Sequence, residues 1–211
     1  MALMAAQMKI PAGLDYAPIS GTNPNLSYGV VEAANGDEPR RTLSDVLVRR
    51  LFPTERPGPG LPWQNPTCEE WDVILPREAC DGFGDPQVLS QAYHLKAREK
   101  IQHLAAVVTL RFPEIEDSAV RMHLHEAWEL SRGFAFTLTR KLEVAGVVIL
   151  HVPARSWGAN GAHAHLVIPV RRIGSAVGFS TFVKQLINPA EGRKLIDAEW
   201  SAHREGAGYA G

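Results

Sequence analysis

The stretches VVILHV (residues 147–152) and AHAHLVIPVRRI (residues 162–173), with ARSWGANG (residues 154–161) between them, decide the fold. Both stretches are rich in valine, isoleucine and leucine, and the connection holds two glycines and an asparagine, which favour turns. The pattern predicts a β-hairpin. Residues from the two strands are then expected to lie side by side.

Three histidines fall on this predicted hairpin. His163 and His165 are two positions apart in one strand, so their side chains project from the same face of the sheet. His151 lies on the other strand and is brought beside them when the strands pair. Three imidazoles on one face would repel one another if protonated, whereas neutral imidazoles are good ligands for a cation. The sequence therefore predicts a divalent metal site at His151, His163 and His165.

The alternative interpretation is three unrelated histidines that are exposed to solvent or satisfied by hydrogen bonds. His123 and His125 have the same spacing, but they fall in a predicted helix, where positions two apart point roughly 200° away from each other. These two histidines are not expected to share a metal.

The composition is that of a folded protein. Hydrophobic residues make up 45% of the 211 residues, which excludes a wholly disordered chain. Lysine and arginine (22) are balanced by aspartate and glutamate (23), so the chain lacks the basic excess of a non-specific nucleic-acid coat protein. Residues 131–173 differ, with six basic residues and one acidic residue. The segment that carries the histidines therefore suits an anionic ligand.

Hydrophobic periodicity and turn residues predict the remaining elements. They are an extended arm (1–27), a strand (26–33), a helix (42–52), a Pro-rich loop (53–66), a strand (69–76), a helix (86–110), a second helix (118–142) and a C-terminal helix (191–204). The end of the 86–110 segment, AAVVTLRF, reads equally as a strand. The expected fold is α/β, with a mainly antiparallel sheet of about five strands, helices on one face and the histidines on the other.

The expected domain organisation is an arm (1–27), one domain (28–205) and a disordered tail (206–211). The opening residues lack the features of a signal peptide or membrane span, and the two cysteines, Cys68 and Cys80, are read as reduced thiols. We expect a soluble, cytoplasmic protein that does not act at a membrane.

Several stretches together resemble the MobA/MobL class of plasmid-mobilisation relaxases, which are HUH endonucleases. They are RGFAF (132–136), the strand VVILHV, HAHLVIPVRR (163–172) with its His-hydrophobic-His motif, AEWSAHRE (198–205) and, upstream, the segment 71–100. The resemblance covers roughly residues 70–205. It implies an HUH/relaxase-like fold and a role in conjugation, with single-stranded DNA and other mobilisation proteins as partners.

The resemblance also implies a mechanism. The three histidines would hold Mn²⁺ or Mg²⁺ against the scissile phosphate, and a tyrosine would attack to leave a 5′-phosphotyrosyl adduct. On ligand type alone, imidazoles favour Mn²⁺ or a later transition metal over Mg²⁺.

The chain departs from the family at the nucleophile. The family's tyrosine lies on the helix after the first strand, but here that helix reads TLSDVLVRRLFPTE, and the matching position falls near Leu51 or Phe52. The catalytic candidates are then Tyr28 and Tyr93, whose alternative role is packing in the core. Tyr16 lies in the arm and Tyr209 in the tail.

Four residues are candidates for contact with DNA. Strand alternation places Arg171 on the face of His163 and His165, and Arg155 and Arg132 are further cations, although arginines at a strand edge also serve simply as a solvated surface. Trp157, in the hairpin loop, either stacks on a base or anchors the loop.

Three functions remain open from the sequence. The first is a metal-dependent nickase that uses a displaced tyrosine or an activated water. The second is a relaxase relative that has lost cleavage and keeps DNA binding or a structural metal. The third is a metalloprotein with no role in nucleic-acid binding.

Overall fold

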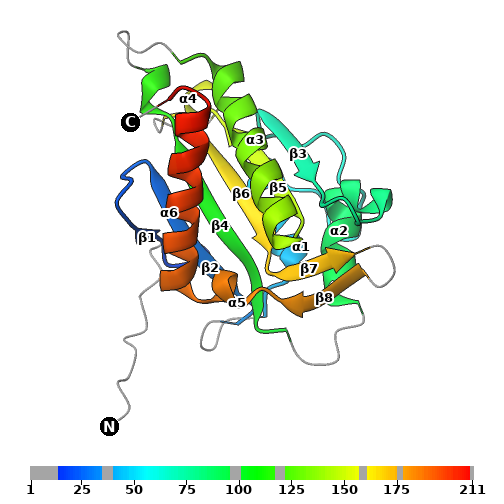
Figure 1. Ribbon diagram of the computed structural model, residues 1–211. Coiled ribbons are helices and arrows are strands. Elements are labelled where there is room, and N and C mark those ends of the chain that lie inside the picture. Colours follow the sequence, from blue (N-terminus) through cyan, green and yellow to red (C-terminus); the bar gives the residue numbers. More distant parts are fainter. Residues whose placement is uncertain are drawn as a thin grey trace.

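A six-stranded antiparallel sheet forms the centre of the protein, with strand order β1-β2-β4-β6-β5-β3 (Figure 1). The computed structural model describes residues 14–34, 40–95, 101–116, 122–156, 161–174 and 178–209. The strands are β1 (Ile19–Ser20), β2 (Leu26–Glu32), β3 (Glu70–Ile74), β4 (His103–Arg111), β5 (Gly146–His151) and β6 (His163–Pro169). The predicted antiparallel α/β fold is confirmed, and the β5–β6 hairpin pairs as expected.

Helices cover both faces of the sheet. α3 (Leu124–Leu142) and α6 (Pro189–Gly206) cross the front in Figure 1 and pack on the face of Leu166 and Ile168. α1 (Leu43–Leu51) and α2 (Pro86–His94) pack on the opposite face, against Val147 and Val167. This second layer corrects the expectation of a helix-free face. Strands covered on both faces read as continuous apolar runs, as β5 does in GVVIL.

Local sequence explains where α1 begins. The Thr42 hydroxyl accepts a hydrogen bond from the Asp45 amide (3.2 Å), and the Asp45 carboxylate accepts one from the Thr42 amide (2.7 Å). This reciprocal cap satisfies amides that would otherwise lack partners at a helix start. Phe52 and Pro53 then end the helix, as predicted.

The predicted helix over residues 86–110 is wrong in its second half. α2 ends at His94, and β4 begins at His103. The strand alternative for AAVVTL is confirmed. β4 lies between β2 and β6 and has seven buried residues. A strand covered on both faces is apolar along its whole length, whereas an amphipathic helix is apolar only on one side. Residues 96–100, within the predicted helix, lie outside the described residues.

The strand predicted to continue to residue 173 also stops early. β6 ends at Pro169, and β7 (Arg171–Gly174) pairs with β8 (Gly178–Phe182) in a separate two-stranded sheet. The remaining short elements are α4 (Pro153–Ser156), α5 (Lys184–Ile187) and the 3-10 helices η1 (Asp81–Gly84) and η2 (Pro113–Ile115). The predicted helix over 118–142 begins at Leu124 within the described part, and the C-terminal helix is longer than predicted.

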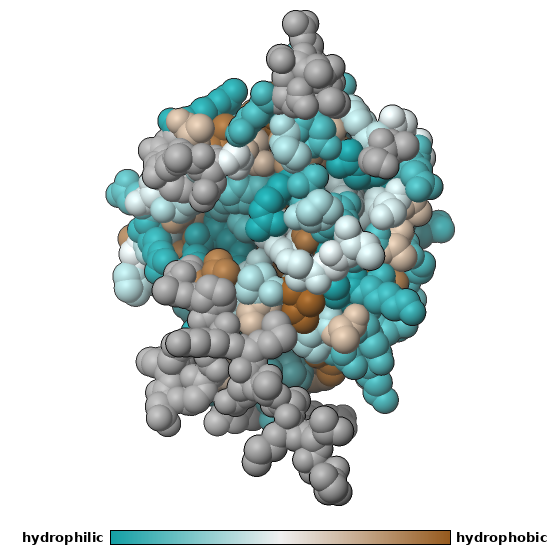
Figure 2. Space-filling model, turned by 90° about the vertical axis from the view of Figure 1, so that its left-hand side faces the viewer, coloured by the Kyte–Doolittle hydropathy of each residue, from teal (hydrophilic) through white to brown (hydrophobic). Residues whose placement is uncertain are grey.

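The described part of the predicted arm is packed rather than loose. β1 pairs with β2, and the side chains of Asp15 and Tyr16 are buried. Residues 1–13 of the arm and residues 210–211 of the tail lie outside the described residues. The face seen in Figure 2 is largely hydrophilic, with only small separate hydrophobic areas. Among the described residues, no helix has the length and apolar character needed to span a membrane.

Candidate metal centre

The sheet brings the three predicted histidines together. β5 and β6 place His151 directly opposite His163, and alternation puts His165 on the same face. The ring centroids are 4.9 Å to 5.3 Å apart. One ring nitrogen from each histidine lies within 4.8 Å of the others. The cluster predicted from spacing is therefore present in the structure.

Hydrogen bonds fix which nitrogen carries the proton in two of the rings. Nε2 of His151 lies 2.7 Å from the Arg50 carbonyl oxygen, and Nδ1 of His163 lies 3.0 Å from the Gly161 carbonyl oxygen. A carbonyl oxygen only accepts, so each of these nitrogens donates. When neutral, His151 therefore keeps a lone pair on Nδ1 and His163 keeps one on Nε2.

The electrostatics keep all three rings neutral near pH 7. Burial, together with the charges of His163 and Arg50, lowers the pKa of His151 to about 4. Burial also lowers the pKa of His163, assisted by the charge of Arg111. The pKa of His165 lies well below its usual value, first through burial and then through Arg50 and the other two histidines. The rings can therefore offer lone pairs without first losing protons.

This donor set fits a divalent cation. Imidazole nitrogens bind zinc, manganese and later transition metals, and three protein ligands leave a coordination position open for water or substrate. An open position distinguishes catalytic sites from closed structural ones. The arrangement can therefore hold a metal and present it to a second ligand.

A buried ion pair lies beside the cluster. Two nitrogens of the Arg50 guanidinium donate to the two carboxylate oxygens of Asp15, at 2.9 Å and 2.7 Å. Burial alone would raise the pKa of Asp15, but the hydrogen bonds and charge of Arg50 outweigh it and lower that pKa. The same guanidinium lowers the pKa of His151 and His165 through its charge. Arg50 therefore lies next to the histidines as one half of a buried ion pair whose charges balance.

None of the tyrosines predicted as catalytic candidates bonds to the cluster. The Tyr28 hydroxyl donates to the Leu186 carbonyl (2.5 Å) in the core under α6, on the sheet face opposite the histidines. The Tyr93 hydroxyl donates to the His103 carbonyl (2.8 Å). Burial raises the pKa of both hydroxyls. Tyr209 donates to Glu126 (3.2 Å).

Tyr16 is connected to the histidines instead. Its hydroxyl lies 3.1 Å from Oγ1 of Thr109, and the same Oγ1 lies 3.0 Å from Nδ1 of His165. Tyr16 was predicted to lie in a loose arm, and Thr109 was not among the predicted site residues. Only the strand order, which puts Thr109 opposite His165, shows that these residues meet.

The four candidate DNA contacts have different surroundings. Arg171 is 7% exposed and donates to three backbone carbonyls, so its guanidinium is committed to the protein. Its guanidinium lies over the ring of Tyr93 in the α1 and α2 layer, and the residue belongs to β7 because β6 ends before it. Arg132 on α3 pairs with Asp72 (2.7 Å), on the side away from the histidines. Arg155 is largely exposed and pairs with Glu69. Trp157 lies outside the described residues.

Two residues on the histidine face were missed. Arg111 is exposed on β4 directly opposite His163. Trp71 is 37% exposed on the edge strand β3 and is in register with Ile149, which in turn faces His165. Strand alternation would have predicted that both side chains lie on the histidine face, but that prediction requires the order of the strands in the sheet.

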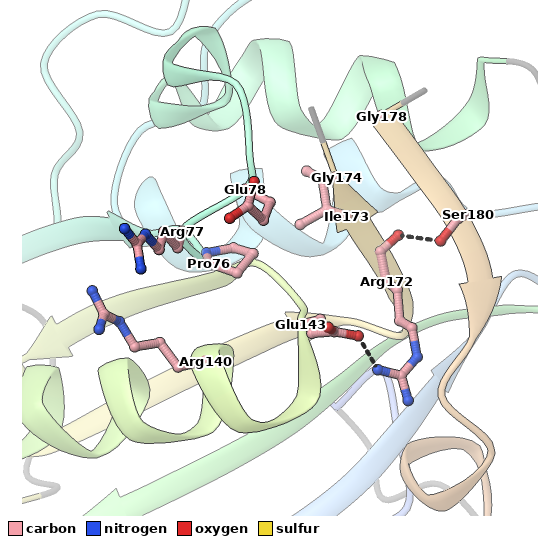
Figure 3. A pocket seen from close by; sticks show the side chains of 10 residues that line it. All are labelled: Pro76, Arg77, Glu78, Arg140, Glu143, Arg172, Ile173, Gly174, Gly178 and Ser180. Atoms are coloured by element: carbon pink, nitrogen blue, oxygen red, sulfur yellow. Dashed lines mark hydrogen bonds and ion pairs between the residues drawn. The ribbon is translucent and has the colours of Figure 1, made fainter. Parts of the chain in front are cut away.

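A separate pocket of about 420 Å³ lies at the other end of the sheet (Figure 3). It is lined by Arg77, Arg140 and Arg172 among others, and Arg172 pairs with Glu143 at 2.5 Å. Ile74, two residues before the pocket residue Pro76, pairs with Gly146 at the start of β5. His151 lies at the other end of that strand, so the pocket is remote from the histidines.

Comparisons with known proteins establish the fold. No family model matches the chain, and no curated protein sequence matches it. The chain is similar to a structure from work on the molecular basis of vancomycin resistance transfer in Staphylococcus aureus, with a TM-score of 0.59, 18% identity and coverage of 88% of this chain and 94% of that chain. A conjugative relaxase TrwC structure in complex with oriT DNA gives a TM-score of 0.47 and 10% identity, covering 86% and 69% of the two chains. The chain therefore shares the overall fold of the structure from the resistance-transfer work.

Proposed function

We propose that this protein binds single-stranded DNA at a divalent metal held by His151, His163 and His165, and that it nicks the strand during mobilisation of a plasmid or similar element. The observation that carries the proposal is the cluster of three neutral imidazoles on the central sheet of a relaxase-type fold. The similar structure from resistance-transfer work supports a role in DNA transfer. Membership of the MobA/MobL class and a cytoplasmic location stay predictions.

The metal would polarise a phosphate at its open position and stabilise the negative charge that develops there. The surrounding protein suits this anion. Arg111 is exposed and lies opposite His163 on β4, whereas the buried Arg50 guanidinium is already paired with Asp15. Exposed cations of this kind contact phosphate without reading sequence. Arg155 is a further phosphate candidate, if DNA replaces its partner Glu69.

The candidate nucleophile is Tyr16, because its hydroxyl is two hydrogen bonds from His165. In the proposed step the tyrosine oxygen bonds to phosphorus, the bond from phosphorus to the 3′ oxygen breaks, and the phenolic proton passes to that 3′ oxygen. The strand keeps a free 3′ hydroxyl and a 5′-phosphotyrosyl bond. The reverse reaction rejoins it.

Binding without cleavage is the second candidate function. It is favoured by one observation: the hydroxyls of all four tyrosines in the chain are hydrogen bonded to protein groups, and Tyr16 itself is 3% exposed. A tyrosine must leave its partner before it can attack phosphorus. A protein that never makes this move would keep the metal and the DNA and leave the strand intact.

The test combines purified protein, Mn²⁺ and end-labelled single-stranded DNA, with denaturing electrophoresis and a parallel binding assay. A covalent adduct that is lost in Tyr16→Phe and retained in Tyr209→Phe supports nicking by Tyr16. Cleavage without an adduct points to water, and Mn²⁺-dependent binding without cleavage supports the second candidate function. Metal uptake with no DNA affinity contradicts both.

A further inference from the structure

Tyr16, Thr109 and His165 form a continuous hydrogen-bonded chain. The two oxygen atoms are 3.1 Å apart, and the Thr109 oxygen is 3.0 Å from Nδ1 of His165. Tyr16 and Thr109 are 3% and 5% exposed, so solvent offers them few other partners. The three residues come from the N-terminal segment, β4 and β6.

The position of Tyr16 is built into the fold. A Cβ atom at Gly29, on β2, would lie 2.1 Å from Cδ2 of the Tyr16 ring, so the ring packs directly on a backbone that only glycine allows to come this close. The Arg50 guanidinium lies 5.9 Å from the centre of the same ring and is clamped by Asp15, the residue before Tyr16. The hydroxyl is therefore held at Thr109 by its surroundings.

The number of available protons limits how this chain can be arranged. The Thr109 hydroxyl has one hydrogen to donate, and each neutral imidazole has one N–H. In the first arrangement Tyr16 donates to Thr109, and Thr109 donates to a lone pair on Nδ1 of His165. In the second arrangement His165 donates from Nδ1 to Thr109, and Thr109 donates to the oxygen of Tyr16. In a third arrangement Thr109 would accept from both neighbours, but its own hydrogen would then point at neither of the two partners described for it, in a side chain that is 5% exposed. The metal-free protein can therefore adopt either of the first two arrangements.

Metal binding selects between the first two of these hydrogen-bond arrangements. Since Nδ1 of His165 is occupied by Thr109, only Nε2 is left to act as the ligand, and the proton must then reside on Nδ1. We propose that metal binding at His165 fixes the second arrangement, in which Thr109 donates to the Tyr16 oxygen and the Tyr16 O–H no longer points at Thr109. This inference rests on the proposed metal site and makes Thr109 a positioning residue for both the ligand and the tyrosine.

As a consequence, metal binding prepares the Tyr16 hydroxyl for the proposed attack on phosphorus. With Thr109 donating to it, the Tyr16 oxygen gains a hydrogen bond, and its own hydrogen no longer has Thr109 as an acceptor. Both changes assist a hydroxyl that must give up its proton when it forms a bond. In the metal-free protein, in contrast, the Tyr16 hydroxyl can still donate its hydrogen bond to Thr109.

The test is a zinc titration of the whole protein labelled with ¹³C at the tyrosine Cζ, followed by NMR, because zinc is diamagnetic and the Cζ shift reports hydrogen bonding at the oxygen. Tyr→Phe variants assign the four signals. We expect zinc to shift the Tyr16 signal, with little change for Tyr28 and Tyr209, and to cause no comparable Tyr16 shift in Thr109→Val. Thr109→Ser, which keeps the hydroxyl, should behave like the parent.

Zinc affinity gives the second measurement. Loss of the bond to His165 in Thr109→Val should weaken zinc binding by about tenfold to a hundredfold, whereas Tyr16→Phe, which leaves that bond intact, should bind nearly as tightly as the parent. If zinc binds to the parent protein without shifting the Tyr16 signal, the inference is overturned. An equal Tyr16 shift in Thr109→Val also overturns it. In both cases the proposed metal site itself is still supported. Absence of zinc binding in the parent overturns the proposed function itself.

Discussion

The His151 side chain is held by the backbone of Arg50, whose carbonyl oxygen accepts a hydrogen bond from Nε2 at 2.7 Å. Arg50 lies in the last turn of α1, so the helix on the histidine face orients a ligand on β5. The guanidinium of the same residue is clamped by Asp15. A buried ion pair thus connects the N-terminal segment to the candidate metal centre.

Breaking this ion pair should destabilise the fold strongly. Asp15→Ala leaves the Arg50 charge buried and without its carboxylate, which costs about 3 to 5 kcal/mol in comparable sites. We expect a loss of this size in the free energy of unfolding, measured with urea. Glu143→Ala is the matched control, because its ion pair with Arg172 is exposed and is worth under about 1 kcal/mol. Similar small losses in both variants would contradict the role given to Asp15.

Acid should destabilise the metal-free protein through His151. Its pKa is about 4 in the folded protein and 6.5 for an ordinary imidazole, so between these values the unfolded chain binds a proton that the folded protein does not. This contribution to stability is fully present above pH 6.5 and is lost as the pH falls toward 4. From pH 7 to pH 5 the loss is about 2 kcal/mol from His151 alone.

The measurement is urea unfolding in EDTA at the two pH values. His151→Gln should reduce the dependence of stability on pH by about 2 kcal/mol. Thr137→Val, at an exposed position that carries no ionisable group, should leave that dependence unchanged. An unchanged dependence in His151→Gln would show that His151 is not held neutral by the fold.

Trp71 should contribute to binding of single-stranded DNA. It shares a sheet face with Val73, which packs in the α1 and α2 layer, and it is 37% exposed. Stacking of a base on an aromatic ring is worth about 1 to 3 kcal/mol, so Trp71→Ala should weaken binding by about fivefold to 150-fold. Fluorescence anisotropy with a labelled oligonucleotide measures this change.

Phe136→Ala is the control for that experiment, since Phe136 is an exposed aromatic residue on α3, across the sheet from the histidines. Equal affinities for Trp71→Ala and the parent protein would place the DNA elsewhere. Equal losses in the two variants would show that neither aromatic residue defines the binding face.

The sequence was sufficient for features that depend on short-range geometry. The two-residue period of a strand places His163 beside His165, and a short hairpin brings in His151. The cap at Thr42 is equally local. These predictions needed no knowledge of which strands are neighbours in the sheet.

Features that depend on strand order could not be predicted in the same way. Thr109 meets His165 only because β4 lies next to β6, and Tyr16 reaches Thr109 only because the N-terminal segment folds over β2. The end of the strand that carries His163 was predicted wrongly, because the chain leaves the sheet at Val170, where no glycine marks the change, and Arg171 belongs to β7. α1 covers part of the histidine face because the buried strand β5 is apolar on both sides.

The most direct test of the metal site is a Mn²⁺ titration followed by electron paramagnetic resonance, with the parent protein, His163→Ala and His123→Ala. His123 belongs to the second His-x-His pair, whose rings stack outside the cluster. We predict one tight Mn²⁺ per chain in the parent and in His123→Ala, and at least about tenfold weaker binding in His163→Ala. Binding by His163→Ala as tight as that of the parent would contradict the assignment of the three histidines as metal ligands.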